Sequence, residues 1–255
     1  TPPATSPASN TLLKSVINFS IYFGTYCTLL ASMKIIGHRG AAGHELENTL
    51  AGLQHAVSLG VWAIEFDIRK TKDGQLVVLH DADLKRMASR PELVGDLTLA
   101  ELENIPLSSG SHIPSLAEAL EVIGKKRAVI ELKDSGCADE LIHVLETFPK
   151  ANVAIASFKL AELAKLRERL PDLKLYGLER TRPFDIIQLA RQLKLNGVGL
   201  NSWLLNPLTY WLCMRADLEM YVYTVDSPFL AKFINRFYPG VNLCTNYPER
   251  FLKKR

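Results

Sequence analysis

Short β-like runs alternate with helical stretches from residue 33 to the C-terminus, and this alternation restricts the fold more than any other feature. Strands that alternate with helices predict a parallel sheet whose crossovers are helical. Eight such units in about 220 residues fit a closed (β/α)8 barrel, the TIM barrel. The alternative is an open doubly wound sheet, but the first turn, GHRGAAG (37–43), lacks the GxGxxG spacing typical of that fold. The predicted strands are 34–38, 63–68, 128–133, 152–157, 173–178, 197–201, 219–225 and 241–246.

One further apolar run, QLVVLH (75–80), falls outside these strands. The link KTKDGQ (70–75) is far too short for a parallel crossover, which takes a dozen or more residues. Asp73-Gly74 is instead typical of a two-residue type I′ turn, so we expect a small β-hairpin inserted after strand 2. In that register Asp67 lies opposite His80. The hairpin would therefore return His80 to the barrel.

Two carboxylates stand inside the apolar strand IEFDI (64–68). Side chains alternate along a strand, so Glu65 and Asp67 point to one face and the apolar side chains point to the other. Active-site side chains of a (β/α)8 barrel stand at the carboxyl ends of its strands. We therefore expect one polar cluster at that end. The other residues expected there are His38, Arg39, His80, Glu131 and Lys133.

This set of side chains indicates metal-dependent chemistry. Three carboxylates facing one lumen would repel each other, and at least one pKa would rise, unless a cation lies among them. Oxygen ligands favour one hard divalent ion, Mg²⁺ or Ca²⁺, over zinc, which prefers His or Cys. Arg39 and Lys133 suit a phosphate, and His38 and His80 supply a general acid and a general base near neutral pH. The sequence therefore predicts metal-assisted hydrolysis of a phosphoester.

Residues 35–86 contain five short motifs in order: HRG, ENT, E-x-D, KDG and HD. In this order and spacing they resemble the N-terminal signature of glycerophosphodiester phosphodiesterases. Weaker matches downstream are IPSLAEAL, IELK, SF, YTV and CTNYP, and the resemblance spans residues 34–250. It implies a TIM barrel of the phospholipase C-like phosphodiesterase type. It also implies hydrolysis of a small-molecule glycerophosphodiester to sn-glycerol 3-phosphate and an alcohol.

The resemblance implies roles for the same residues that the strand pattern brings together. From the hairpin register we expect His80 to be the general base and His38 the general acid. Trp203, after the sixth barrel strand, is the candidate for lining the substrate pocket. The attacking group, which is water or the glycerol 2-hydroxyl, stays open. Carried over by position, the metal ligands are Glu65, Asp67 and Glu131, the acid/base pair is His38 and His80, and the phosphate contacts are Arg39 and Lys133.

Three positions depart from the family pattern. Leu46 replaces a proline before ENT, Asn246 stands where the family has Asp, and residues 104–115 form a shorter loop without the usual aromatic residues. We interpret Asn246 as structural. Glu47 is expected to cap or orient the first helix, or to contact Arg39. Two other functions stay open: a lysophospholipase of the C or D type, and a catalytically silent barrel that binds phosphodiesters or metal.

The composition gives little sign of a macromolecular partner. Thirty basic residues against 27 acidic ones leave a net charge of +3 without a basic stripe, so no nucleic-acid partner is expected. The four cysteines form neither a CxxC pair nor a metal-ligand spacing. This pattern favours a reducing compartment, and we expect a cytoplasmic location.

Residues 1–32 differ in character from the rest of the chain. The Pro/Ser/Thr-rich start (1–10) is typical of a disordered segment. Residues 16–33 carry no charge, but polar side chains dilute them, and they fall short of the ~20 predominantly apolar residues of a spanning helix. We therefore expect a disordered segment, a signal or anchor within 12–31, or upstream sequence, followed by a barrel domain at 33–255. Only a genuine anchor or signal would make the protein membrane-associated or exported.

Overall fold

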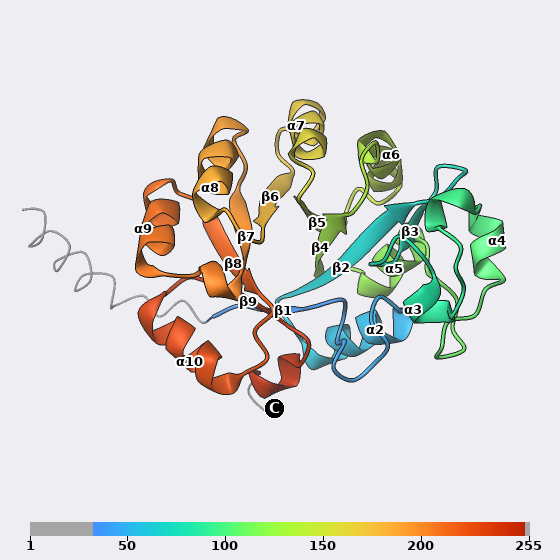
Figure 1. Ribbon diagram of the computed structural model, residues 1–255, viewed down its shortest axis with the longest axis horizontal. Helices are drawn as coiled ribbons and strands as arrows, with labels where there is room; N and C mark the ends of the chain where they lie inside the picture. The colour runs from blue at the N-terminus through green and yellow to red at the C-terminus, as the bar shows by residue number, and fades with distance from the viewer. Residues whose placement is uncertain (1–32, 253–255) are drawn as a thin grey trace, which may run out of the picture. The chain divides into compact units, whose positions relative to one another are not determined.

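Eight parallel strands close into a barrel in the computed structural model, which describes residues 33–252 (Figure 1). Strand β1 pairs with β9 on one side and with β2 on the other, and this closes the ring. The predicted (β/α)8 barrel is confirmed, and the open sheet is wrong. Our expectations for residues 1–32, including an anchor at 12–31, lie outside the described residues. The barrel strands are β1 (Ile35–Gly37), β2 (Ala63–Lys70), β4 (Arg127–Leu132), β5 (Asn152–Ser157), β6 (Lys174–Glu179), β7 (Gly197–Asn201), β8 (Glu219–Tyr223) and β9 (Asn242–Thr245).

Helices cover the outside of the barrel between consecutive strands (Figure 1). Their starts follow local signals: the Thr49 hydroxyl accepts a hydrogen bond from Gly52 N, and Ser115 forms a capping box with Glu118. Within residues 33–252, no helix combines the length and the apolarity needed to cross a membrane. The helices are α2 (Leu50–Leu59), α5 (Leu116–Ile123), α6 (Ala138–Thr147), α7 (Leu160–Arg169), α8 (Pro183–Gln192), α9 (Pro207–Arg215) and α10 (Pro228–Phe237), and the 3-10 helix η4 (Pro248–Arg250) follows β9.

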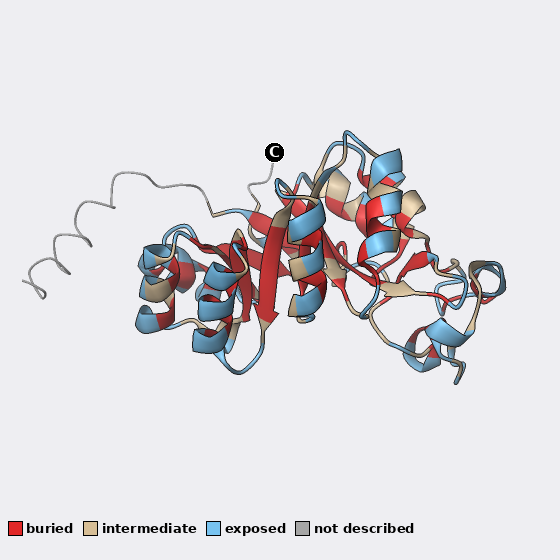
Figure 2. Cartoon of the chain, turned by 90° about the horizontal axis from the view of Figure 1, so that it is seen from above, coloured by how far each residue is buried: buried red, intermediate tan, exposed pale blue. Residues whose placement is uncertain are grey.

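The barrel strands are largely buried (Figure 2), and the side chains of β2 divide between the two faces of the sheet. Ile64, Phe66 and Ile68 are fully buried in the layer between sheet and helices. Each such side chain contributes about 1.5–3 kcal/mol when it leaves water. Glu65 and Asp67 alternate with them and therefore face the interior of the barrel, as the strand pattern predicts.

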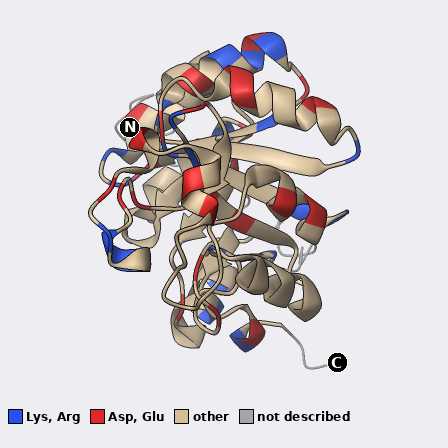
Figure 3. Ribbon diagram, turned by 90° about the vertical axis from the view of Figure 1, so that its right-hand side faces the viewer, with Lys and Arg blue, Asp and Glu red and all other residues tan. Residues whose placement is uncertain are grey.

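The segment between β2 and β4 is larger than a bare hairpin. Its strand β3 pairs antiparallel with β2, which confirms the predicted insertion after strand 2. Leu84, Met87 and Leu102 belong to an apolar cluster of this segment, separate from the layer under the barrel helices. Basic and acidic residues are interspersed over this side of the molecule (Figure 3). The segment comprises β3 (Leu76–Val78), α3 (Lys85–Ala88), the 3-10 helix η2 (Val94–Asp96) and α4 (Leu99–Glu103).

The hairpin register differs from the predicted one by one residue. Leu79 N donates a hydrogen bond to Asp67 O (3.1 Å), so Asp67 lies opposite Leu79 and not opposite His80. The predicted pairing of Asp67 with His80 is therefore wrong. His80 follows the end of β3, where the alternation of the strand no longer fixes its side chain, and its charge still acts on Asp67.

The cause of the slip is the turn. A type I′ turn needs a positive φ at both central residues, but Gly74 (φ 80°) has one and Asp73 does not. Thr71 N donates to Gln75 O (2.9 Å) and closes a three-residue loop. The Thr71 hydroxyl also contacts Asp73 Oδ1 (2.5 Å), which holds that loop. One extra loop residue shifts every later pair by one position.

Candidate active site

Three carboxylates meet inside the barrel near the carboxyl ends of β2 and β4. Glu65 and Asp67 lie on β2, and Asp67 pairs in register with Glu131 of β4. Each side chain offers one oxygen atom, and these atoms lie within 4.8 Å of one another. Glu65 and Asp67 are only 4% and 1% exposed, so water solvates their charges poorly. The cluster is a set of hard oxygen donors of the kind that Mg²⁺ and Ca²⁺ prefer.

The electrostatics of the cluster leave room for more positive charge. Burial, with the charge of Asp67, raises the pKa of Glu65 to about 8 and the pKa of Glu131 to about 7. Burial also tends to raise the pKa of Asp67. The charges of Lys133 and Arg39 outweigh this effect, so the pKa of Asp67 is lowered. The two basic side chains therefore compensate one carboxylate well and the other two poorly. A divalent cation fits this donor set, because it would favour the ionised form of all three.

Lys133 and Arg39, the two residues predicted to contact the phosphate, border the cluster. Lys133 Nζ lies 3.0 Å from Asp67 Oδ1 and 2.5 Å from Glu131 Oε1. Arg39 Nε lies 3.3 Å from Asp67 Oδ2, and it is buried without a hydrogen-bond partner among residues 33–252. A buried donor of this kind beside the cluster suits an anionic oxygen of a ligand.

Asn48 holds Asp67 in place, a role that sequence reasoning missed. Asn48 Nδ2 donates to Asp67 Oδ2 (2.9 Å), and Asp67 N donates to Asn48 Oδ1 (3.2 Å). Its backbone has φ 57°, a conformation that Asn tolerates better than most residues. Thr49 caps the following helix instead. Asn and Thr are both common N-cap residues, so the ENT motif alone does not separate these roles.

His38 is held by a relay of two further side chains. His38 Nδ1 lies 2.7 Å from Asn246 Oδ1, and Asn246 Nδ2 donates to Asp226 Oδ2 (2.8 Å). A carboxylate can only accept, so the Asn246 amide must direct its NH₂ to Asp226 and its oxygen to His38. Neutral His38 therefore carries its proton on Nδ1, and Nε2, 4.0 Å from Glu65 Oε2, is left as an acceptor. The interpretation of Asn246 as merely structural is incomplete, because it contacts the histidine itself.

His80 is bound to a carboxylate and reaches Arg39 through a chain of charged groups. His80 Nδ1 lies 2.6 Å from Asp81 Oδ1, and Arg86 Nε donates to Asp81 Oδ2 (2.6 Å). Arg86 and Arg39 both donate to Glu47 Oε1 at 2.7 Å. Burial raises the pKa of Asp81, but hydrogen bonds from Arg86 and His80 outweigh it and bring the pKa to about 2. Of the two expectations for Glu47, the structure shows the contact with Arg39.

The two histidines differ in what surrounds them. Burial, followed by the charge of Arg39, lowers the pKa of His38. Burial also lowers the pKa of His80. Asp67 and Asp81 raise that pKa in part, without reversing the shift. His38 has a neutral amide on Nδ1, whereas His80 has a carboxylate there. A carboxylate stabilises the protonated imidazole more than an amide does.

A small cavity lies beside His38, Glu65 and Glu131, and its other walls are Leu178, Tyr221, Tyr223 and Cys244. Trp203 does not line it. This residue lies in the 3-10 helix η3 (Ser202–Leu204) after β7, and it is 91% exposed. The structure therefore brings together all the predicted site residues except Trp203.

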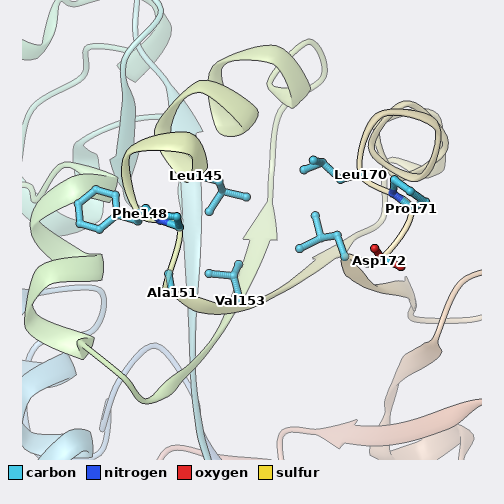
Figure 4. A pocket seen from close by; sticks show the side chains of 9 residues that line it. Leu145, Phe148, Ala151, Val153, Leu170, Pro171 and Asp172 are labelled. Atoms are coloured by element: carbon cyan, nitrogen blue, oxygen red, sulfur yellow. The ribbon is translucent and has the colours of Figure 1, made fainter.

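A larger hollow of about 300 Å³ is unrelated to this cluster (Figure 4). Its walls include Leu145, Phe148, Val153 and Leu170, with Asp172 at one edge. They come from the last turn of α6, the start of β5 and the connections that precede β5 and β6, at the end of the barrel opposite the carboxylates. A mainly apolar hollow with one acidic side chain offers no catalytic set.

Residues 38–249 match the Glycerophosphoryl diester phosphodiesterase family. The chain is 34% identical over 251 residues to a glycerophosphodiester phosphodiesterase of Bacillus altitudinis, a match that covers 87% of this chain and 98% of that protein. It is also 37% identical over 144 residues to a human lysophospholipase D, which covers 53% of this chain and 42% of that protein.

Solved structures show the same fold. A glycerophosphodiester phosphodiesterase from Thermotoga maritima aligns with a TM-score of 0.75 at 26% identity, covering 88% of this chain and 98% of that chain. An Oleispira antarctica phosphodiesterase in complex with its product sn-glycerol-3-phosphate aligns with a TM-score of 0.79, covering 86% and 94%. At 24% identity, the second likeness concerns the fold alone.

Proposed function

Because this chain belongs to the glycerophosphoryl diester phosphodiesterase family, we propose that it hydrolyses glycerophosphodiesters to sn-glycerol 3-phosphate and an alcohol at the cluster of Glu65, Asp67 and Glu131. The observation that carries this proposal is the meeting of three carboxylates, two of them buried and Glu131 partly buried, with two histidines and two basic side chains at one end of the barrel. Packing alone does not place charged groups together in this way.

Glu65, Asp67 and Glu131 would hold one divalent cation, Mg²⁺ or Ca²⁺. When bound, the cation supplies positive charge that polarises a phosphoryl oxygen. The raised pKa values of Glu65 and Glu131 support this assignment, since both carboxyls lack a sufficient counter-charge. Lys133 and Arg39 would bind the phosphate oxygens of the substrate, and this role is supported by Arg39 Nε, which has no hydrogen-bond acceptor among residues 33–252.

The acid and the base are assigned from the partners of the two imidazoles. The expected order, with His80 as base, depended on a hairpin register that the structure contradicts. We assign His38 as the base, because its Nε2 is left as an acceptor. His80 is the acid, because Asp81 favours its protonated form.

The proton transfers then balance. His38 Nε2 takes the proton of the attacking oxygen, which belongs to water or to the glycerol 2-hydroxyl. The bond from that oxygen to phosphorus forms, and the bond from phosphorus to the alcohol oxygen breaks. His80 gives its proton to the leaving alkoxide, so the two imidazoles have exchanged protonation states. In the cyclic route, water then opens the cyclic phosphate by the reverse transfers.

Lysophospholipids are the second candidate class of substrate. This candidate is favoured by the match to a protein named lysophospholipase D, which reaches 37% identity over 144 residues. Such substrates share the glycerophosphodiester group and differ in carrying an acyl chain.

A cytoplasmic location stays part of the proposal, and the buried free thiols of Cys137, Cys213 and Cys244 support it.

One experiment tests the proposed function. The purified protein is incubated with a panel of glycerophosphodiesters and lysophospholipids, with EDTA and then with added Mg²⁺ or Ca²⁺. We expect release of glycerol 3-phosphate that EDTA abolishes and one of the two ions restores. Product release that is insensitive to chelation would contradict the metal assignment, and no release from any substrate would contradict the function.

A further inference from the structure

Exposed apolar side chains gather on one arc of the barrel end that carries the carboxylates. Trp203 is 91% exposed, Phe229 is 81% exposed, and Leu208 and Phe184 are 52% and 50% exposed. Each belongs to the connection or the first helical turn that follows a barrel strand. We call Phe184, Trp203, Leu208 and Phe229 the apolar rim.

The topology places the apolar rim at the mouth of the site. Phe184 follows β6, Trp203 and Leu208 follow β7, and Phe229 follows β8. These three strands are neighbours in the barrel, so the four residues follow one another around that end. The carboxyl ends of parallel strands lie at one end of a barrel, and Glu131 near the end of β4 lies there too.

The rest of the carboxylate end of the barrel exposes few large apolar side chains. Among residues 33–252, the other large apolar side chains exposed in a connection or first helical turn that follows a barrel strand at this end are Leu230, next to Phe229, and Leu93 of the insertion. The other exposed ones, such as Phe233 and Phe237, lie further along the outer helices. Exposed apolar groups concentrated beside a site mark a surface that contacts something.

The chemistry of the arc fits a lipid surface. Tryptophan and phenylalanine anchor proteins at the boundary between lipid headgroups and acyl chains. Arg180 and Arg182 precede Phe184 and are exposed, so they can contact lipid phosphates at the same depth. The apolar groups come from three separate connections. Single exposed side chains on separate connections suit insertion between lipid molecules better than packing against a folded protein.

We propose that the apolar rim docks the mouth of the barrel onto a phospholipid surface. A substrate with an acyl chain, such as a lysophospholipid, would then reach the carboxylate cluster without entering bulk water. This second part rests on the proposed function, whereas the docking itself does not. The proposed partner is therefore a phospholipid surface, and the test must distinguish it from a protein partner.

Tryptophan fluorescence tests the docking directly. The chain has three tryptophans, so Trp62→Phe/Trp211→Phe leaves Trp203 as the reporter. Trp203→Phe/Trp211→Phe leaves Trp62, which lies between Lys34 and Arg127 at the amino end of β2. With vesicles of brominated phosphatidylcholine and phosphatidylglycerol, we expect strong quenching of Trp203 and none of Trp62. Equal quenching of both, or quenching of neither, overturns the proposal.

A matched pair of double variants tests which residues bind the vesicles. We expect Phe184→Ala/Phe229→Ala to weaken vesicle binding by about tenfold or more, because each side chain loses apolar area in lipid. The control Phe233→Ala/Phe237→Ala removes two rings of α10 that are also exposed, at 44% and 47%, but lie away from the mouth, and it should change binding less than about twofold. Equal losses in both pairs overturn the proposal. A rim-dependent dimer in lipid-free sedimentation that vesicles leave intact also overturns it and indicates a protein partner.

Turnover separates this proposal from the proposed function. We expect the rim variant to keep the wild-type rate on water-soluble glycerophosphocholine and to lose about tenfold on vesicle-borne lysophosphatidylcholine. A wild type that hydrolyses neither substrate contradicts the proposed function, and the docking is then decided by the quenching experiment. A rim variant that retains the full rate on the vesicle-borne substrate overturns delivery through the rim.

Discussion

Replacing Asp226 by asparagine should inactivate the enzyme by moving one proton. Asp226 Oδ1 accepts from the Thr245 hydroxyl and from Asn246 N, both at 2.8 Å. In Asp226→Asn the new oxygen stays with these two donors, so the new NH₂ group faces the NH₂ group of Asn246. Both residues are partly buried, and leaving a donor unpaired there costs up to about 1–3 kcal/mol per group. Rotation of the Asn246 amide avoids this cost, and its NH₂ then faces His38.

The rotated amide changes the tautomer of His38. Nδ1 must now accept a hydrogen bond, so the proton moves to Nε2, and Nε2 can no longer take a proton from the attacking oxygen. A general base is typically worth about 10²–10⁴-fold in rate. We therefore expect kcat of Asp226→Asn to fall by about that factor, which is about 3–5 kcal/mol in the barrier.

A second substitution should restore the activity. In Asp226→Asn/Asn246→Asp the two groups are exchanged: the new carboxylate accepts from His38 Nδ1–H and from the new amide. The control Asp73→Asn makes the same chemical change in a hydrogen-bonded turn outside the site. The assays are kcat on a glycerophosphodiester and ¹⁵N NMR shifts of the His38 ring, which report its tautomer. The reasoning is refuted if Asp226→Asn keeps the Nδ1–H tautomer, or if the double variant is as inactive as the single one.

Three further outcomes are expected. Glu131→Gln should weaken metal affinity, measured by calorimetry, and activity together, and a variant with wild-type affinity would contradict its role as a ligand. Without metal, stability should fall as pH rises from about 6.5 to about 8. The folded-state pKa values of Glu65 (about 8) and Glu131 (about 7) exceed the ordinary 4.5, so these groups bind more protons in the native state than in the unfolded state, whereas the lowered pKa values of His38 and His80 act in the opposite direction mainly below this window. A metal-free melting temperature that rises over this range would count against the reasoning, and added Mg²⁺ or Ca²⁺ should flatten the profile. His80→Ala should lose about 10²–10⁴-fold on a natural substrate but far less on a nitrophenyl ester, whose leaving group needs no proton, and rescue of His38→Ala instead would reverse the assignment.

The barrel was predictable because its signals are local. The strand predicted at 152–157 coincides with β5, and Thr49 and Ser115 cap helices that the sequence pattern predicts. Alternating side chains likewise predict which face of β2 carries Glu65 and Asp67. Each of these inferences needs only a few neighbouring residues and the geometry of one element.

The parts that sequence reasoning missed depend on geometry that no local pattern contains. The hairpin register depends on the sign of one φ angle, at Asp73, and Asp-Gly fits either kind of turn. Asn246 and His38 are 208 residues apart, so their contact exists only once the barrel has closed. Trp203 follows a barrel strand as predicted, but its side chain turns to solvent. Position along the chain places a residue at the mouth without giving the direction of its side chain.

The insertion after β2 makes the catalytic end of this barrel divisible into two parts that can be exchanged separately. The carboxylates stand on barrel strands and His38 directly follows β1, whereas His80 stands on a segment with its own apolar cluster. The chain of charged groups from Asp81 through Arg86 to Glu47 joins that segment to the first barrel turn. An engineer could therefore lengthen or replace residues 90–113, and so reshape what the enzyme accepts, while leaving the metal ligands and both histidines in place. In such a chimera Arg86 would have to be kept, because its contacts with Asp81 and Glu47 join the inserted segment to the barrel.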